Sequence, residues 1–180
     1  MIIIDLLEND IEKINQTARL LHESFEAWPT IDSAIREVFE SLSDDSISRV
    51  LVNGDDEVIG WIGGRSQYDG NVWELHPLVI RKDGRMRGFG KLLVIDFERQ
   101  VYQRGGISII LGTDDEYNQT SLANVNLYDD IPAHLSNFES LDHPANFYRK
   151  LGFVIVGVIP DANGIGKPDI IMAKRVKSVD

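Results

Sequence analysis

A strand, a basic loop and an amphipathic helix follow one another in the middle of this chain, and their order constrains the fold more than any other feature. Residues 72–80 are largely apolar, which is typical of a strand. The loop 85–90 reads RMRGFG, and the segment from its end onward carries apolar side chains four residues apart: Phe89, Leu93, Phe97 and Val101. That spacing predicts a helix with one apolar face. The apolar run at 107–111 predicts a strand covered on both faces, so the unit is typical of a mixed α/β domain.

Hydrophobic patterns along the rest of the chain predict the element order β-α-α-β-β-β-α-β-α-β-β. A first strand at 1–7 precedes two helices. The first is expected over residues 11–25, and the second is expected to be capped by Asp32 or Ser33 and to carry apolar residues from 35 to 42. Trp28-Pro29 separates these helices, because the residue before a proline disfavours helical geometry. Residues 114–142 are acidic and polar, and no element is predicted there. A length of 180 residues favours one domain, with boundaries 1–180.

The formal net charge of −11 excludes some partners and favours others. Nucleic-acid binders usually show a basic footprint, so we expect no nucleic-acid partner. The negative charge is compatible with a cationic small-molecule partner that the electrostatic field attracts. It is equally compatible with a charge whose only role is to keep the protein soluble. The chain contains no cysteine, which excludes disulfides, a thiol nucleophile and thiolate metal sites. The four histidines show no ligand spacing with one another, so no metal is expected.

Neither a membrane span nor a secretion signal is predicted. The N-terminal stretch MIIIDLLENDIEK lacks a basic segment and turns acidic after a short apolar run, unlike a signal peptide. No run approaches the ~18 uninterrupted apolar residues that a membrane-spanning helix needs. We therefore expect a soluble cytoplasmic protein without a membrane partner.

The loop RMRGFG has the properties of an anion-binding site. Five of the eighteen Lys and Arg residues fall between Arg81 and Lys91. The loop leads into a helix, whose first turn presents unpaired N–H groups and the positive end of the helix dipole. Gly88 and Gly90 allow an anion to approach the backbone, although they also suit a basic turn in which glycines serve geometry alone. The spacing fits neither the P-loop nor the G-x-G-x-x-G dinucleotide fingerprint.

The spacing R-x-x-G-x-G between a strand and a helix resembles the pyrophosphate-binding signature of the GCN5-related N-acetyltransferase (GNAT) family. The segment FYRKLGF at 147–153 is similar to that family's F-Y-x-K-x-G-F segment. Five further segments resemble the aminoglycoside 6'-N-acetyltransferases of Gram-positive bacteria: 73–79, 111–115, 157–160, 162–164 and 167–170. The resemblance runs from about residue 47 to 175 and is weak in 114–142 and in the first two helices. It implies the GNAT fold, a mixed and mostly antiparallel central sheet flanked by helices.

The resemblance also implies acetyl-CoA as co-substrate, no metal, and a homodimer. It places the coenzyme A pyrophosphate on backbone N–H groups of the loop, where the residues alone indicate an anion. A backbone N–H at a bulge in the preceding strand polarises the thioester in that family, and Leu78 or Val79 is the candidate here. Pro77 lacks an N–H and marks the expected break in pairing. The candidate coenzyme-binding residues are Leu78, Val79, Arg85, Met86, Arg87, Gly88, Phe89, Gly90 and Lys91.

Acetyl transfer to an amine also needs a proton acceptor and help for the departing thiolate. Glu74 is the candidate that binds the ammonium group and accepts its proton. His76, two residues on, lies on the same strand face and can relay that proton. A solvated edge carboxylate and a structural histidine are the alternatives. Tyr148 matches the family position whose hydroxyl lies near the sulfur; otherwise it is an aromatic packed beside Phe147 and Phe153.

Acidic and aromatic residues complete the candidate substrate site. Asp114, Asp115 and Glu116 follow a strand and suit a polycationic sugar, unless they form only a solvated loop. Trp28 and Tyr68 are candidates for its apolar wall, with a core position equally open for Trp28. The predicted function is direct acetyl transfer from acetyl-CoA to the 6'-amine of an aminoglycoside antibiotic, conferring resistance, since no cysteine can carry an acyl group. The rivals are the same chemistry on a polyamine or a peptide or protein N-terminus, and a coenzyme A-binding module without turnover.

Overall fold

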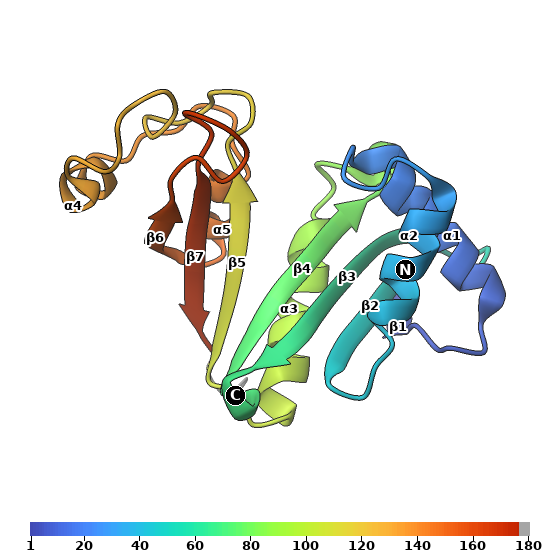
Figure 1. The fold of residues 1–180 in the computed structure, drawn as a ribbon. Helices are drawn as coiled ribbons and strands as arrows, with labels where there is room; N and C mark the ends of the chain where they lie inside the picture. The colour runs from blue at the N-terminus through green and yellow to red at the C-terminus, as the bar shows by residue number, and fades with distance from the viewer. Residues whose placement is uncertain (177–180) are drawn as a thin grey trace. The chain divides into compact units, whose positions relative to one another are not determined.

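A computed structural model describes residues 1–176 as two compact units (Figure 1). The first unit contains Met1–Ile109 together with Val176, and the second contains Ile110–Arg175. Residues 177–180, the end of the predicted domain, lie outside the described part of the chain. Seven strands occur in residues 1–176, with helices between them, and the pairings within each unit are antiparallel wherever their register is known. The predicted mixed α/β class with a mostly antiparallel sheet is confirmed.

Four antiparallel strands form the sheet of the first unit. Their order is β1 (Ile2–Asp5), β2 (Ser46–Val52), β3 (Val58–Gln67) and β4 (Val72–Ile80). All seven residues of β2 are buried, and the strand lies inside the sheet with a neighbour on each side. A short 3₁₀ turn, η1 (Tyr68–Gly70), joins β3 to β4.

Helices cover both faces of this sheet, and the alternation of side chains along β3 explains how. Trp61 packs in a buried cluster with Ile14 of α1 (Ile11–Ser24) and Val38 of α2 (Ile31–Glu40). Gly64 faces the other way, and a Cβ there would lie 2.3 Å from the ring of Phe97 in α3 (Phe89–Gln103). Because successive side chains of a strand point to opposite faces, α1 and α2 lie on one face and α3 on the other.

The three long helices begin in different ways. Asp10 caps α1 by accepting a hydrogen bond from the backbone N–H of Lys13 at 3.1 Å. Thr30 and Ser33 form a reciprocal capping box at the start of α2, which satisfies two backbone donors. In contrast, α3 begins at Gly88 without a side-chain cap. Its first-turn N–H groups are therefore left for another acceptor.

The second unit is built on three strands in the order β5 (Ser108–Asp114), β7 (Asp169–Arg175) and β6 (Val154–Ile159). The first two residues of β5 belong to the first unit. Two short helices, α4 (Ile131–Ser136) and α5 (Ala145–Lys150), lie in the chain between β5 and β6. In Figure 1 the long segment between β5 and α5 passes over the end of the strands where β5 finishes. Apolar side chains from these parts are buried: Leu111, Leu122, Leu127, Phe153, Ile170 and Met172.

The predicted element order is confirmed apart from one addition. Helix α4 lies within 114–142, where the sequence pattern predicts no element. The predicted cap of the second helix at Asp32 or Ser33 is wrong by two or three residues, because Thr30 is the cap and forms the capping box with Ser33. None of the helices in residues 1–176 is both long enough and apolar enough to cross a membrane.

Candidate active site

Strand β4 contains a β-bulge where the sequence predicts a break in pairing. The register with β3 shifts there, so that His76 and Pro77 together face the single residue Gly63. A Cβ on Gly63 would lie 2.7 Å from the carbonyl oxygen of His76, so only glycine fits without moving the backbone. Pro77 has no N–H for the ladder. The predicted break at Pro77 is therefore confirmed, and it lies directly before the candidate donors Leu78 and Val79.

The hydrogen-bond pattern of the ladder distinguishes these two donors. The backbone N–H of Arg81 donates to the carbonyl of Ile59 on β3 at 2.8 Å. N–H groups of an antiparallel strand point alternately to its two edges, so Val79, two residues back, also points its N–H toward β3. The N–H of Leu78 therefore points to the other edge of β4. Of the two candidates, Leu78 has the donor that the β3–β4 ladder does not use.

The loop 85–91 presents backbone N–H groups in the way the sequence predicts. Met86 and Gly88 adopt positive φ angles of 58° and 82°, which bring the chain into α3 through a left-handed turn. A Cβ on Gly88 would meet nothing within 4 Å, so the backbone angle rather than space favours glycine. The first intrahelical bond of α3 runs from Leu92 N–H to the Gly88 carbonyl at 3.1 Å. The N–H groups of residues 89–91 come before it and have no intrahelical acceptor.

The basic side chains around the loop differ in how far their charge is compensated. The Arg81 guanidinium contacts Asp83 at 2.8 and 3.0 Å and Glu57 at 3.3 Å. Hydrogen bonding to Asp83, more than to Glu57, raises the pKa of Arg81. Arg85 donates from Nε to the carbonyl of Ile80 at 3.1 Å. The Arg87 guanidinium lies 5.3 Å from the ring centre of Phe89. Within residues 1–176 neither Arg85 nor Arg87 forms an ion pair, so both keep positive charge available at the loop.

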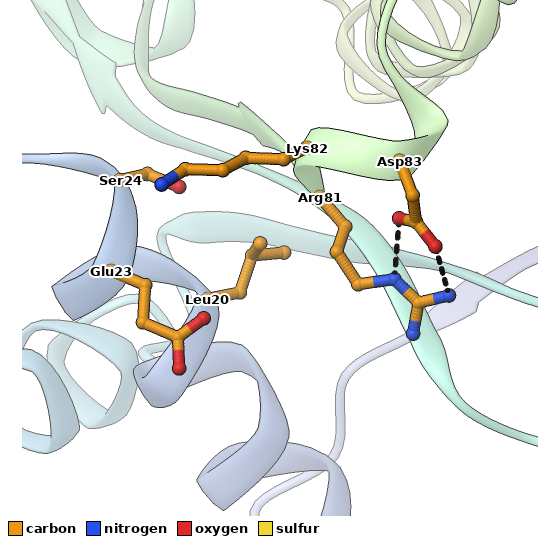
Figure 2. Close-up of a pocket in the computed structure, with 6 residues that line it drawn as sticks. All are labelled: Leu20, Glu23, Ser24, Arg81, Lys82 and Asp83. Carbon is orange, nitrogen blue, oxygen red and sulfur yellow. Dashed lines mark hydrogen bonds and ion pairs between the residues drawn. The ribbon is translucent and has the colours of Figure 1, made fainter.

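A cavity of about 220 Å³ lies beside this loop (Figure 2). It is lined by the end of α1 and the 3₁₀ turn η2 (Lys82–Gly84), through Leu20, Glu23, Ser24, Arg81, Lys82 and Asp83. Figure 2 shows the Lys82 side chain extending toward Ser24 while Arg81 turns to Asp83. The volume of this cavity is below the roughly 300 Å³ at which small-molecule pockets begin. We therefore assign no substrate to this cavity.

The candidate acid–base residues lie on the β4 strand among polar and aromatic neighbours. Glu74 is half-buried and accepts a hydrogen bond from the side-chain amide of Gln67 at 2.6 Å. His76 is exposed, and its ring centre lies 5.9 Å from that of Trp28. The structure thus brings Trp28 and His76 together, as the predicted substrate site requires. Tyr68 is 74% exposed in η1, next to Gln67 in the chain.

A hydrogen bond holds the segment that carries Trp28. The carbonyl of Trp28 lies 2.8 Å from Nδ1 of His22. Since a carbonyl only accepts, His22 carries a proton on Nδ1. The ring of Phe25 packs edge-on against Trp28 at 5.6 Å. Trp28 also packs against the buried cluster of the first unit, so a core contact and a wall of the candidate site are compatible.

In the second unit, Tyr148 lies in α5 within an aromatic cluster. Its ring packs edge-on against Phe147 at 5.0 Å and against Phe153 at 5.5 Å. Burial raises the pKa of Tyr148, because the phenolate is disfavoured away from water. The phenol therefore remains protonated at neutral pH and can act as a hydrogen-bond donor.

The three acidic residues at 114–116, the first of which ends β5, have different environments. Asp115 is completely buried, and its carboxylate accepts hydrogen bonds from Gln119 N–H at 2.7 Å and from the N–H and hydroxyl of Thr120. That arrangement shapes the loop and leaves no surface for a substrate. Asp114 is exposed and accepts a hydrogen bond from the Asn163 amide at 2.5 Å. Glu116 is exposed.

Residues 1–176 contain no group of three His, Asp or Glu side chains arranged to hold a metal ion. His143, which the sequence pattern leaves without a role, is buried instead. Its Nε2 lies 3.1 Å from the Asp114 carbonyl, and its Nδ1 accepts from Ala145 N–H at 3.2 Å. These partners define a neutral ring that joins the end of β5 to the start of the Tyr148 helix.

Comparisons with known proteins agree with these features. Residues 14–129, more than half of the chain, match the Acetyltransferase (GNAT) family. The chain therefore belongs to the GNAT acetyltransferase family, and the predicted resemblance is confirmed. A comparison with curated proteins found no match.

Three solved structures are similar over the whole chain. The first is an aminoglycoside 6'-N-acetyltransferase complexed with coenzyme A, 39% identical with a TM-score of 0.94 over 100% of this chain and 99% of that one. The second is the aminoglycoside 6'-N-acetyltransferase from Enterococcus faecium, 40% identical with a TM-score of 0.91 over 100% and 99%. The third is aminoglycoside 6'-acetyltransferase type Ii, 37% identical with a TM-score of 0.77 over 100% of both chains.

Several polar residues around the candidate site have no signal in the sequence pattern. Gln67 and His22 contact Glu74 and the Trp28 carbonyl, respectively. Both contacts depend on strand register or loop geometry, which hydrophobic periodicity does not encode. Asn163 is an exception, because it lies in one of the segments that carry the family resemblance.

Proposed function

We propose that this protein transfers the acetyl group of acetyl-CoA directly to the 6'-amino group of an aminoglycoside. The observation that carries the proposal is 37–40% identity, over essentially the whole length of both chains, to three structures named for this reaction. One of them contains coenzyme A. We also propose that both units belong to one catalytic domain spanning 1–180. The protein acts in the cytoplasm, where acetyl-CoA is made, and confers aminoglycoside resistance there.

The coenzyme is held by the end of β4 and the loop that follows it. The pyrophosphate accepts hydrogen bonds from the N–H groups of residues 86–91 at the positive end of α3. Arg85 and Arg87 add charge, and Lys91 extends it into the first turn. The thioester carbonyl accepts from the N–H of Leu78, and the ladder geometry supports this choice over Val79. As the carbonyl oxygen becomes an oxyanion, this hydrogen bond strengthens and lowers the barrier.

The amine is prepared by the acidic residue of β4. An aminoglycoside amine is largely protonated at neutral pH, so one ammonium group must lose a proton before it attacks. Glu74 binds the ammonium and accepts that proton, and His76 passes it to solvent. Trp28 and Tyr68 line the sugar-binding wall. The role of Trp28 is supported by its contact with His76.

Transfer then proceeds in a ternary complex. The amine nitrogen bonds to the thioester carbon, the tetrahedral intermediate collapses, and the carbon–sulfur bond breaks with its electron pair on sulfur. The nitrogen loses its second proton as the amide forms, and solvent returns that proton to the departing thiolate. Tyr148 donates a hydrogen bond to the departing thiolate. Burial keeps its phenol protonated, which supports hydrogen-bond donation more strongly than complete proton transfer.

Exposed acids bind the other ammonium groups of the substrate. Asp114 and Glu116 are exposed, in keeping with this role. We assign Asp115 to the loop that carries them, since both of its oxygens are engaged there. A net charge of −11 steers a polycation toward the protein.

A thiol-release assay with acetyl-CoA tests the proposal. We expect turnover with a kanamycin-like compound that carries a 6'-amine and none with a counterpart that carries a 6'-hydroxyl. Glu74→Ala and Tyr148→Phe should both slow transfer while calorimetry still detects coenzyme A binding. Turnover of spermidine or a peptide N-terminus without any aminoglycoside would instead favour another amine substrate. Coenzyme A binding without any turnover would favour a non-catalytic module.

The chain also forms a homodimer in this proposal. The strand β6 carries Val154, Val156 and Ile159, which are 51–60% exposed. The proposed interface is the hairpin of β6 and β7, residues 154–175. Sedimentation equilibrium measures the assembly, and Val156→Lys should convert a dimer to a monomer. A wild-type monomer at micromolar concentration would contradict this assembly.

A further inference from the structure

A glutamine supports the carboxylate that the proposed function places at the amine. Gln67 is the last residue of β3, and its Nε2 donates to Oε2 of Glu74 on β4 at 2.6 Å. Both side chains are half-buried. In the strand register Gln67 pairs with Val72, so the contact runs diagonally across the two strands. Side chains at diagonal positions of one sheet face are within reach when they are long.

The residue directly opposite Glu74 in the sheet is a cation, yet Glu74 is hydrogen-bonded to a neutral amide instead. Arg65 pairs with Glu74 in the register, so both side chains leave the same face of the sheet. The Arg65 guanidinium instead contacts Glu40 at 3.2 Å and Glu37 at 4.0 Å, both on α2. The cation that could neutralise Glu74 is thus occupied by two other carboxylates. The partner that Glu74 does have is neutral.

We infer that Gln67 is a positioning residue that holds one oxygen of Glu74 and leaves the other for the substrate ammonium, without neutralising the net charge of the carboxylate. This inference rests on the proposed function. An arginine in the same place would orient the carboxylate but compete with the ammonium for its charge. An amide orients it through a charge-assisted hydrogen bond and carries no charge of its own. The titratable groups nearest in the chain and register are His76, Tyr68, Asp69 and Arg65 with its α2 partners.

Three substitutions test this role in the full-length protein. Gln67→Met keeps the length of the side chain and removes the donor. We expect kcat/KM for a 6'-amino aminoglycoside to fall roughly tenfold, which is the usual scale for a hydrogen bond to a charged group. The KM for acetyl-CoA should not change, because the coenzyme is held elsewhere on β4. In a Glu74→Gln background the same substitution should have no further effect, since the two residues act as one unit.

Gln67→Glu gives a readout that a purely structural role would not change. Two carboxyl groups at 2.6 Å hold a proton between them at pH values where a single carboxylate is ionised. The acid limb of the kcat/KM profile should therefore move upward by about one pH unit. Gln103→Glu is the matched control, because it adds the same charge at an exposed position near the end of α3. Its profile should coincide with that of the wild type.

The outcomes separate this inference from the proposed function. If the wild type acetylates no aminoglycoside, the proposed function fails and the positioning role fails with it. If the wild type is active and Gln67→Met matches it in kcat/KM, only the role of Gln67 is overturned. Coenzyme A calorimetry and thermal unfolding report whether each variant is folded. If Gln67→Met does not fold, the Gln67→Glu profile decides, and an unshifted acid limb overturns the inference.

Discussion

Replacing Gly63 by alanine should damage catalysis through the bulge in β4. A Cβ at this position would lie 2.7 Å from the carbonyl oxygen of His76 and 3.2 Å from the Trp61 ring, whereas ordinary contact begins at 3.4 Å. The nearer atom belongs to the backbone, so no rotamer change relieves the contact. The bulge must move by several tenths of an ångström, and the adjacent N–H of Leu78 moves with it.

The size of the effect follows from that displacement. Overpacking of this kind costs about 1–3 kcal/mol of stability. A misplacement of 1 Å in a catalytic site can lower the rate about 10²-fold, so a displacement of several tenths of an ångström should lower kcat about tenfold. The KM for acetyl-CoA should remain unchanged, because the pyrophosphate-binding loop begins beyond the end of β4.

Thiol release measures kcat, and urea unfolding measures the free energy of unfolding. Gly54→Ala is the matched control, since a Cβ at this exposed turn position would meet nothing within 4 Å. We expect this control to retain the kcat of the wild type. If Gly63→Ala also retained it while losing stability as expected, the bulge could not be the source of the oxyanion donor.

Further predictions concern Tyr148, Asp96 and the acidic residues Asp114 and Asp115. Tyr148→Phe should lower kcat about 10- to 100-fold without weakening coenzyme A binding, as thiol release and calorimetry will show. Burial raises the pKa of Tyr148, so above pH ~10 the phenol ionises in the unfolded chain but not in the folded protein. Above that pH the wild type should therefore lose up to about 1.4 kcal/mol of stability per pH unit relative to Tyr148→Phe. The buried guanidinium of Arg49 lies 2.7 Å from the Asp96 carboxylate. Asp96→Ala removes that partner and should lower the free energy of unfolding in urea by about 3–5 kcal/mol. Combining Asp96→Ala with Arg49→Met should restore most of the loss. Asp115→Asn should cost about 2 kcal/mol because an amide cannot accept all the loop N–H and hydroxyl donors, whereas Asp114→Asn should raise the aminoglycoside KM at unchanged stability.

The parts of the fold that hydrophobic period alone encodes could be predicted from the sequence. The four-residue spacing from Phe89 to Val101 gave the buried face of α3, and Phe97 indeed packs against Gly64. The loop before this helix could be predicted because its glycines and cations lie together in the chain. The break at Pro77 could be predicted because proline lacks a ladder donor.

The segment 114–142 could not be predicted, for a physical reason. The conformation of this segment depends on contacts between residues far apart in the chain, such as the pairing of Thr120 with Ser140. Buried polar groups supply the rest: Asp115 holds the loop at Thr120, and His143 joins Asp114 to the start of α5. Helix α4 has only six residues, too few for a periodic signal. From the sequence, Asp115 is one of three adjacent acids, and only burial distinguishes it.

The first unit orders three chemical groups along one strand, and this order explains why the site tolerates opposite charges. Glu74 and Ile80 are separated by six residues of β4, roughly 20 Å at about 3.3 Å per residue. The carboxylate for a cationic amine lies before the bulge, the candidate oxyanion donor lies at it, and the cationic loop for phosphates follows the strand. That separation exceeds the Debye length of about 8 Å, so exposed charges at the two ends of the strand are largely screened from each other. Glu74 is thus not neutralised by the cations of the loop, and Gln67, which has no charge, orients it without removing that advantage.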